Sequence, residues 1–510
     1  MLSKIFLLFN TILSIKIYLK NGSIYFTYSL ILINCIFILI IFYNFYWKRR
    51  NLPDGPIPLP IIGNALEISN ADRRYKCFAD WAKKYGPVYT IWIGEQPLVI
   101  ITDYELIKSA FIRDGDTYVD RDFLIKHFTL FFGSVDGIIR TNGEQWRQMR
   151  KFFYKAMRDY GIDKDTVEKQ VLDAIFRVID KIKNEKEMGK LEHSIDREVD
   201  LMTGSIINQI MLGFSFYGER FKEFSGLKQL LDIQQVYFIS FWSLLIEMSP
   251  WIRHIPIYVK HFYNYGKKAT ESIFEYSKKE IDKRIEARKD PNYLPEEGMD
   301  VLDQFLESVE ETDQNDPENY YKVKYLTAFV YDMFWLDSNG RKRGLAEETG
   351  EEFDGKFCQS DRTKLSYTNA VVNETQRLSN LLPLNLTRVA NKDVKIGGHS
   401  LKAGTVVIPQ ISTVLFDERI FPDPEKFIPE RFLDENGQFK KIEENIPFGV
   451  GKRSCVGEAL ARMELFLFTA NFFYKFHVYP PNPLNPPKYE KRQTFAVKLP
   501  EYNCSVELRN

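Results

Sequence analysis

The sequence is poor in cysteine and has no excess of either charge. Its five cysteines are widely scattered and odd in number, which favours a reducing compartment over a disulfide framework. Basic and acidic residues number 69 each, so no strong field favours nucleic acid, and we expect no nucleic-acid partner. The chain also lacks a linker-like stretch after residue 64, and its 510 residues are enough to bury a large core.

One long segment near the N-terminus has no charge at all. Ser23 to Trp47 would span about 37 Å as a helix, which is enough to cross a bilayer with some tilt. Aromatic residues at its end are typical of a membrane interface, and three basic residues follow them. We therefore expect a transmembrane anchor over residues 23–50, because a buried core helix is rarely so long and charge-free. Lysines on both sides leave its orientation open, and the apolar residues 1–22 have no assignment.

Four prolines follow the anchor within residues 51–64. Proline prevents helix formation and favours a stiff extended chain, so we interpret this stretch as a hinge region that spaces a folded body from the membrane. The body itself is then residues 65–510, which we expect to form one domain.

A glycine-rich loop around Cys455 is the strongest chemical signal, within the sequence FGVGKRSCVGEALAR from Phe448 to Arg462. An apolar, helix-favouring run follows, so the loop brings Cys455 to the start of a helix. Unpaired backbone N–H groups and the positive helix dipole there favour a thiolate. Small residues let a flat group approach the backbone, Phe448 offers a ring to pack on it, and Arg453 offers a guanidinium for a carboxylate.

Two interpretations of this loop remain open from the residues alone. A haem would satisfy all of its features, with the iron at Cys455 and a propionate at Arg453. A lone cysteine in a structural loop is also common, because cysteine often serves as a small buried apolar residue. Zinc is not indicated, since no second cysteine lies nearby.

The loop resembles the haem-binding loop of the cytochrome P450 superfamily. Its pattern Phe448-x-x-Gly451-x-Arg453-x-Cys455-x-Gly457 matches at every defined position. The resemblance implies a mainly α fold with small β-sheets, the cytochrome P450 fold of a helical haem-thiolate domain, with Cys455 as axial thiolate and iron ligand. It is closest to the microsomal branch that oxidises drugs and lipids, and it covers residues 52–510.

Further motifs extend the resemblance on the haem side. Trp146 and Arg150 are four residues apart and share one helix face, which by itself is typical of an amphipathic surface helix. The family has a Trp-x-x-x-Arg helix here whose two side chains bind a haem propionate. Arg121 and Arg388 also lie where relatives place basic propionate ligands.

A second group of motif residues is expected to be structural. Glu374 and Arg377 match the family's Glu-x-x-Arg, and Arg431 belongs to its Pro-Glu-Arg-Phe. An isolated pair of this kind is usually a solvated surface pair. The resemblance implies instead that the three form a charge cluster that holds the cysteine loop in place.

The residue patterns also predict local elements. Residues 88–93 and 98–101 predict a β-hairpin, residues 106–112 a short helix, residues 142–153 a helix, and residues 160–330 mostly helix. A second hairpin is expected between residues 394–396 and 405–408 across Gly397 and Gly398.

The resemblance implies a haem monooxygenase that inserts one oxygen atom of O₂ into an apolar lipid, steroid or xenobiotic. Electrons would come from NADPH through a diflavin reductase, and the catalytic domain would face the cytosol from the endoplasmic reticulum membrane. Aromatic-rich residues 237–263 would form the access channel and a second contact with membrane lipid. A basic docking face for the reductase is expected from Arg147, Lys151, Lys155, Lys440, Lys441 and Lys452.

One family motif is missing. Relatives carry Ala-Gly-x-(Asp/Glu)-Thr on a long distal helix, whose acid and threonine relay protons to dioxygen. Here those two positions are Asn339 and Gly340, and the stretch from Asp332 to Glu374 is shorter than in relatives by about five helical turns. Three readings follow: a monooxygenase whose sequence lacks a coding segment within residues 335–357, a haem-thiolate isomerase or dehydratase, or an inactive haem-binding pseudoenzyme. The first accounts for the abrupt return of the family motifs at about Ser360.

Overall fold

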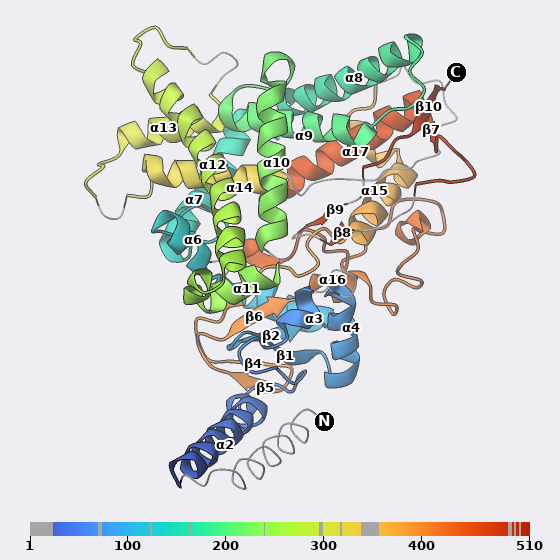
Figure 1. The fold of residues 1–510 in the computed structure, drawn as a ribbon. Helices are drawn as coiled ribbons and strands as arrows, with labels where there is room; N and C mark the ends of the chain where they lie inside the picture. Colours follow the sequence, from blue (N-terminus) through green and yellow to red (C-terminus); the bar gives the residue numbers. More distant parts are fainter. Residues whose placement is uncertain are drawn as a thin grey trace.

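Helices make up most of the structure, and the strands are short (Figure 1). The computed structural model describes residues 24–69, 74–122, 125–162, 165–238, 240–294, 299–316, 319–337, 356–487, 492–493, 496–498 and 501–509. Its α-helices are α2 (Ile24–Phe45), α3 (Ala65–Ser69), α4 (Arg74–Tyr85), α5 (Tyr104–Ile107), α6 (Ile125–Phe132), α7 (Gly143–Tyr160), α8 (Asp165–Glu187), α9 (Ile195–Leu212), α10 (Phe221–Phe238), α11 (Phe241–Met248), α12 (Ile257–Ala287), α13 (Val301–Glu311), α14 (Val323–Asp337), α15 (Ser366–Ser379), α16 (Ile411–Leu415) and α17 (Glu458–Lys475).

Shorter elements connect these helices. The 3₁₀ and π segments are η1 (Trp47–Arg49), η2 (Lys108–Arg113), η3 (Gly115–Tyr118), η4 (Gly218–Arg220), η5 (Pro250–His254), η6 (Gln359–Thr363), η7 (Pro429–Phe432) and η8 (Gly451–Arg453). The strands are β1 (Val88–Ile93), β2 (Gln96–Ile101), β3 (Arg388–Val389), β4 (Val394–Ile396), β5 (His399–Leu401), β6 (Val406–Pro409), β7 (Phe476–Tyr479), β8 (Arg492–Gln493), β9 (Val497–Lys498) and β10 (Ser505–Leu508).

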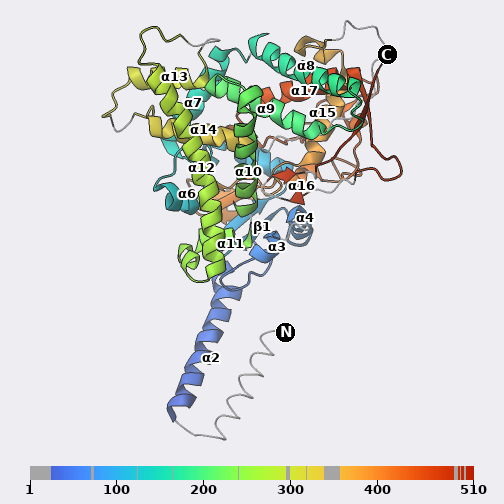
Figure 2. The same ribbon diagram turned by 45° about the horizontal axis from the view of Figure 1, so that its top comes forward.

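Helix α2 projects from the helical body (Figure 2). A window from Ile31 to Arg49 is long and apolar enough to cross a membrane, and little of it is buried. Residues 53–58 then run extended along β1, where the N–H of Thr90 donates to the carbonyl of Asp54 over 3.2 Å. Gly55 has no room for a side chain, because a Cβ would overlap the carbonyl oxygen of Thr90. The proline-rich stretch therefore lies against the body.

The largest sheet has the strand order β1-β2-β6-β3. The predicted hairpin of β1 and β2 is confirmed, with Val88 opposite Ile101. Strand β6 adds parallel to β2, and β3 pairs antiparallel with β6. This sheet lies at the end of the body from which α2 projects (Figure 1).

The prediction of the second hairpin is wrong in its second strand. Residues 394–396 form β4 as expected, but β4 pairs with β5 (His399–Leu401). Gly397 and Gly398 both have positive φ, so the chain reverses within two residues. Residues 406–409 instead form the fully buried strand β6, because continuous apolar strands suit the interior of a sheet.

The remaining local predictions agree with the structure in type. Residues 106–112 are helical, although α5 begins earlier at Tyr104 and continues as a π segment. Helix α7 covers the predicted 142–153 helix and extends to Tyr160, and residues 165–337 are mainly helical. Much of the large core lies between α7, α8, α9, α12, α14 and α17, which surround the site described next.

Candidate functional site

Cys455 lies on the loop that leads into α17. Its backbone N–H donates to the carbonyl of Phe448 over 3.0 Å, which closes the loop. Gly449 and Gly451 have φ of +74° and +71°, a region that glycine adopts without strain. A Cβ at Gly451 would also overlap the carbonyl oxygen of Phe111. The glycines of the motif therefore set the loop shape that presents Cys455.

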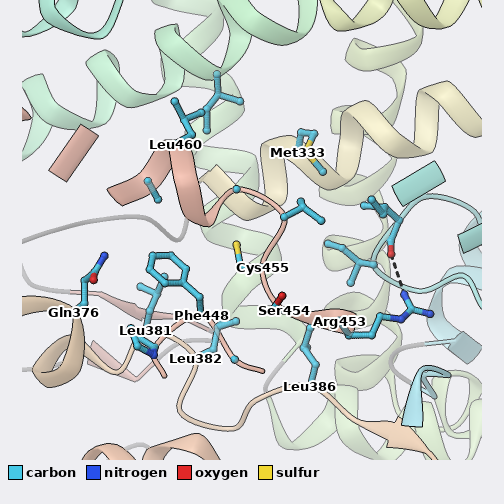
Figure 3. A pocket seen from close by; sticks show the side chains of 18 of the residues that line it. Met333, Gln376, Leu381, Leu382, Leu386, Phe448, Arg453, Ser454, Cys455 and Leu460 are labelled. Carbon is cyan, nitrogen blue, oxygen red and sulfur yellow. Dashed lines mark hydrogen bonds between the residues drawn. The ribbon is translucent and has the colours of Figure 1, made fainter. Parts of the chain in front are cut away.

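The Cys455 sulfur points into a mainly apolar cavity (Figure 3). Helices α7, α9, α14, α15 and α17 and the loops around residues 381–388 and 447–457 contribute to its walls. Gly457 lines the cavity, and a Cβ built there would meet nothing within 4 Å. Open space therefore lies beside Gly457, two residues from Cys455. Apolar side chains around this space include Ile138, Ile139, Phe153, Met333, Leu386 and Leu460.

Three arginine side chains converge on the backbone next to Cys455, and the side chain of a fourth arginine extends from that backbone. Arg121 and Arg388 each donate to the carbonyl of Arg453, over 3.3 and 3.4 Å, and Arg150 donates to that of Ser454 over 2.9 Å. Arg453 itself donates to the carbonyls of Val119, Ile138 and Thr141. All four arginines line the cavity. Across the described ranges, none of them forms an ion pair with a carboxylate.

These arginines are held at an electrostatic cost. Burial, together with the charge of Arg150, lowers the pKa of Arg388 to about 9. Burial and the charges of Arg388 and Arg150 likewise lower the pKa of Arg453 to about 8, although Asp120 opposes the shift. A guanidinium keeps its proton in proteins. Proton loss therefore does not relieve this electrostatic cost. An anion that enters the cavity would relieve it.

Trp146 of α7 provides a further hydrogen-bond donor beside these arginines. Its ring is buried, and the guanidinium of Arg453 lies 4.0 Å from the ring centroid. The indole Nε1 is buried and has no acceptor among the described residues. A buried N–H without a partner costs free energy, so it is typical of a site that binds an acceptor.

The pKa shift of the Cys455 thiol is opposite to the one expected from the sequence. We expected the loop N–H groups and the helix dipole to favour a thiolate. Burial instead raises the pKa of the Cys455 thiol, and the N–H of Gly457 and the charges of Arg150 and Arg121 only partly oppose this effect. Helix α17 begins at Glu458, three residues beyond Cys455, so its dipole is weak at the sulfur. A cation bound at the sulfur would oppose this effect and favour the thiolate form.

The donor set fits a haem. A haem presents an iron, for which a thiolate is a known axial ligand, and two propionates, for which buried guanidinium groups are good partners. The cavity places one thiol, four unpaired arginines and open space beside Gly457 around a single volume. Arg453 and Cys455 lie close to each other on the same loop in Figure 3.

The three residues of the expected charge cluster lie together in the structure. Arg377 and Glu374 are fully buried on α15 and form two hydrogen bonds of 2.7 and 2.8 Å. Arg431 approaches the same carboxylate at 3.4 Å. Arg377 also donates to the carbonyl of Leu415, which ties α15 to α16. The cluster lies apart from the sulfur and joins α15 to the segment around η7.

Comparison with known proteins now identifies the family. The family model for cytochrome P450 matches residues 53–335 and 343–507. The chain belongs to the cytochrome P450 family. It is 31% identical over 456 residues to cytochrome P450 2H2 of Gallus gallus, covering 85% of this chain and 88% of that protein. It is also 30% identical to cytochrome P450 2A5 of Mus musculus (84% and 89% covered) and 29% identical to cytochrome P450 2G1 of Oryctolagus cuniculus (91% and 94% covered).

Membership establishes the cofactor and the reaction class. As a P450, the protein uses haem iron and is a monooxygenase, an oxidoreductase that incorporates molecular oxygen. Its mainly helical fold with small sheets also agrees with the expectation from sequence. The structure brings nearly all expected haem residues to one cavity: Arg121, Arg150, Arg388, Phe448, Arg453, Cys455 and Gly457 line it. Trp146 packs directly behind Arg453, and Gly451 shapes the loop.

One buried ion pair of this P450 was not predicted from the sequence. Asp332 of α14 is fully buried and bonds Arg140 over 2.6 Å. It also accepts the backbone N–H groups of Ile138 and Ile139, which line the cavity. No motif marks Arg140, because its partner lies 192 residues away.

The family model leaves residues 336–342 of this P450 unmatched, and these include Asn339 and Gly340. Helix α14 ends at Asp337. Asn339, Gly340 and the rest of residues 338–355 lie outside the described part of the chain.

Proposed function

We propose that Cys455 supplies the axial thiolate of the haem iron in this P450. In the same proposal the haem propionates are bound by Trp146, Arg121, Arg150, Arg388 and Arg453. The observation that supports this proposal best is that three guanidinium groups converge on the backbone carbonyls next to one thiol, while the buried side chain of Arg453 extends from the same loop. Phe448, Gly451 and Gly457 form the wall of the haem cradle in this arrangement.

The haem, when bound, supplies the oxygen chemistry, and a thiolate ligand favours O–O cleavage. We infer that one oxygen atom enters an apolar small molecule, such as a lipid, steroid or xenobiotic, and that the other leaves as water. The apolar walls of the cavity support this substrate class, because they exclude water and offer few polar partners. The P450 relatives favour this reaction over an isomerase or dehydratase.

We propose that an NADPH-dependent diflavin reductase delivers the electrons to a basic face. The six residues predicted for this face are all exposed: Arg147, Lys151, Lys155, Lys440, Lys441 and Lys452. Lys452 lies three residues from Cys455 and pairs with Asp116 at the surface. Reversing the charges of Lys441 and Lys452 is expected to weaken reductase binding at low salt. Unchanged affinity would remove these residues from the docking face.

We propose that α2 anchors this P450 in the endoplasmic reticulum membrane with the body in the cytosol. Exposed apolar side chains on η5 and at the start of α12 support a second lipid contact from residues 237–263. These are Trp251, Ile255 and Ile257. In Figure 2, α11, which leads into η5, lies at the end of the body from which α2 projects.

We infer that the sequence lacks a coding segment after α14, within residues 335–357, where the family's Ala-Gly-x-(Asp/Glu)-Thr motif is expected. The family model breaks off at Trp335 and resumes at Arg343, which supports a local interruption within an otherwise intact P450. Sequencing genomic DNA and transcripts between the codons for Phe334 and Phe357 tests this. An unread exon that encodes Ala-Gly-x-Glu-Thr is expected. A continuous reading frame without one would favour a pseudoenzyme.

The thiolate assignment is tested with Cys455→Ser. The reduced wild-type protein with carbon monoxide is expected to give the red-shifted absorption band of a thiolate-ligated haem, and the variant is expected to lose it. Cys358→Ser is the matched control, because Cys358 is half-buried and hydrogen-bonded away from the cavity. If Cys455→Ser kept the band, the assignment would be wrong.

A further inference from the structure

Arg462 of α17 lies outside the proposed haem cradle and connects two helices. Its Nε donates to the carboxylate of Glu458, one turn earlier, over 2.9 Å. Its Nη1 donates to the side-chain oxygens of Gln376 and Asn373 of α15, over 3.1 and 3.4 Å. A guanidinium carries five N–H donors in one rigid plane, so these bonds fix its orientation as well as its position.

The same guanidinium lies over the ring of Phe448, with its central carbon 5.0 Å from the ring centroid. A cation in this position is attracted by the negative face of the ring, most strongly where water is excluded. Phe448 lines the cavity at Cys455, whereas Arg462 is not among the described residues that line it. The guanidinium therefore holds the ring from the side that faces away from the cavity.

The position of the Phe448 ring matters for the Cys455 sulfur. Both side chains belong to the wall of the same cavity (Figure 3). The two residues are also joined by the backbone bond from the Cys455 N–H to the Phe448 carbonyl. Gly449, between them, adds no side chain, and a Cβ there would meet nothing within 4 Å. The Phe448 ring is thus an apolar cover beside an open position, and an apolar shell around a metal ligand controls the access of water.

We propose that Arg462 is a positioning residue that holds the Phe448 ring in place and so keeps water away from the Cys455 sulfur. Arg462 takes no part in the chemistry and acts only through the ring. The bonds to Glu458, Gln376 and Asn373 keep its guanidinium over the ring. The proposal rests on the proposed ligation of the haem by Cys455, and it adds a residue that protects this bond from water.

The test uses the full-length, haem-loaded protein in nanodiscs, reduced and saturated with carbon monoxide. The readout is the rate at which the thiolate-type absorption band decays at a fixed temperature. In Arg462→Met we expect the band to decay about tenfold faster, because the ring loses its cation and water reaches the sulfur. Arg177→Met is the matched control, since it removes an exposed arginine of α8 that lies 4.9 Å from the centroid of the Tyr217 ring. Neither Arg177 nor Tyr217 lines the cavity, so the rate should be unchanged.

A second background shows whether Arg462 acts through the ring. Phe448→Leu alone should accelerate the decay, because the smaller side chain covers less of the sulfur. Adding Arg462→Met to Phe448→Leu should then cause little further change, since two changes to one interaction are not additive. A purely structural role of Arg462 predicts the same acceleration in both backgrounds, and that result would overturn the proposal.

Hydrogen exchange provides a readout that does not use the haem spectrum. The Cys455 amide should exchange about tenfold faster in Arg462→Met, because release of the ring also frees the Phe448 carbonyl that accepts this N–H. Faster exchange in the variant, together with a wild-type protein that lacks the thiolate band, would support the role of Arg462 and contradict the Cys455 assignment. Unchanged exchange and unchanged decay in a folded Arg462→Met variant would show that Arg462 does not hold the ring.

Discussion

Placing four guanidinium groups around one loop, with three of them buried, is unfavourable unless an anion joins them. Arg388 illustrates this, since it is buried and its bonds to the carbonyls of Leu386, Thr387 and Arg453 are long, at 3.1 to 3.4 Å. The same arrangement becomes favourable when two propionates enter, because charge-assisted hydrogen bonds then replace mutual repulsion. Apoprotein stability and haem affinity should therefore respond in opposite directions to the loss of one arginine.

Arg388→Met tests this at the residue scale. We expect the apoprotein to unfold at the same or a higher urea concentration, because one repelling charge is gone. We expect haem to dissociate about tenfold faster or more, since a charge-assisted bond contributes about 1.5–3 kcal/mol. Haem transfer to apomyoglobin measures the rate. Arg419→Met removes an exposed arginine paired with Asp417 and should change neither quantity. Equal haem loss from both variants would contradict the proposed role of Arg388.

At the scale of elements, α14 fixes the wall of the cavity through one carboxylate. Asp332 is fully buried, and burial raises its pKa despite the Arg140 charge and the N–H groups of Ile139 and Ile138. Gly137 lies so close that a Cβ there would overlap the Asp332 carboxylate. The segment before α7 is therefore held in one conformation against α14.

Asp332→Asn should destabilise the fold strongly. The amide keeps the shape but leaves Arg140 as an unpaired buried charge, a change that costs about 3–5 kcal/mol. Equilibrium urea unfolding followed by far-ultraviolet circular dichroism measures the loss. Asp417→Asn is the control, because its partner Arg419 is exposed and such pairs contribute about 1 kcal/mol or less. Similar losses in the two variants would show that the Asp332 contacts do not stabilise the segment.

At the scale of the whole molecule, the anchor is docked on the body. Asn44 of α2 donates to the carbonyl of Pro58 over 2.7 Å, and Arg49 donates to that of Gly55 over 3.0 Å. Lys48 is almost fully buried between the Trp92 ring and the Glu95 carboxylate. The proline-rich stretch expected to act as a hinge therefore connects α2 to the β1–β2 hairpin by direct contacts.

A charge swap tests this docking. Lys48→Glu places two carboxylates together and should accelerate hydrogen exchange at the Ile61 amide, which donates to Glu95 over 3.1 Å. We expect about a tenfold change, because repulsion displaces the Glu95 carboxylate and the Ile61 N–H loses a charged acceptor. Lys48→Met removes the ion pair without adding repulsion, so a smaller acceleration at Ile61 is expected. Lys402→Glu, from an exposed pair with Asp393, should have no effect at Ile61. Unchanged exchange at Ile61 in Lys48→Glu would refute this docking.

The sequence was most informative where function needs particular residue types at short spacing. The Cys455 loop and the Glu374–Arg377 pair could be found because each lies within a few residues. Glycine at 449 and 451 could likewise be tied to a tight loop, since local backbone geometry depends on local residues. The apolar run of α2 was visible for the same reason.

Contacts between distant segments could not be read in this way. The pairing of β6 with β2 was missed because two short apolar stretches give no sign of which partner they choose. The Asp332–Arg140 ion pair joins residues 192 positions apart. The raised pKa of Cys455 also depended on how deeply the folded chain buries it, because desolvation opposes the loop dipoles that the sequence predicts. The sequence by itself thus determined which groups carry the chemistry, and the tertiary structure decided what surrounds them.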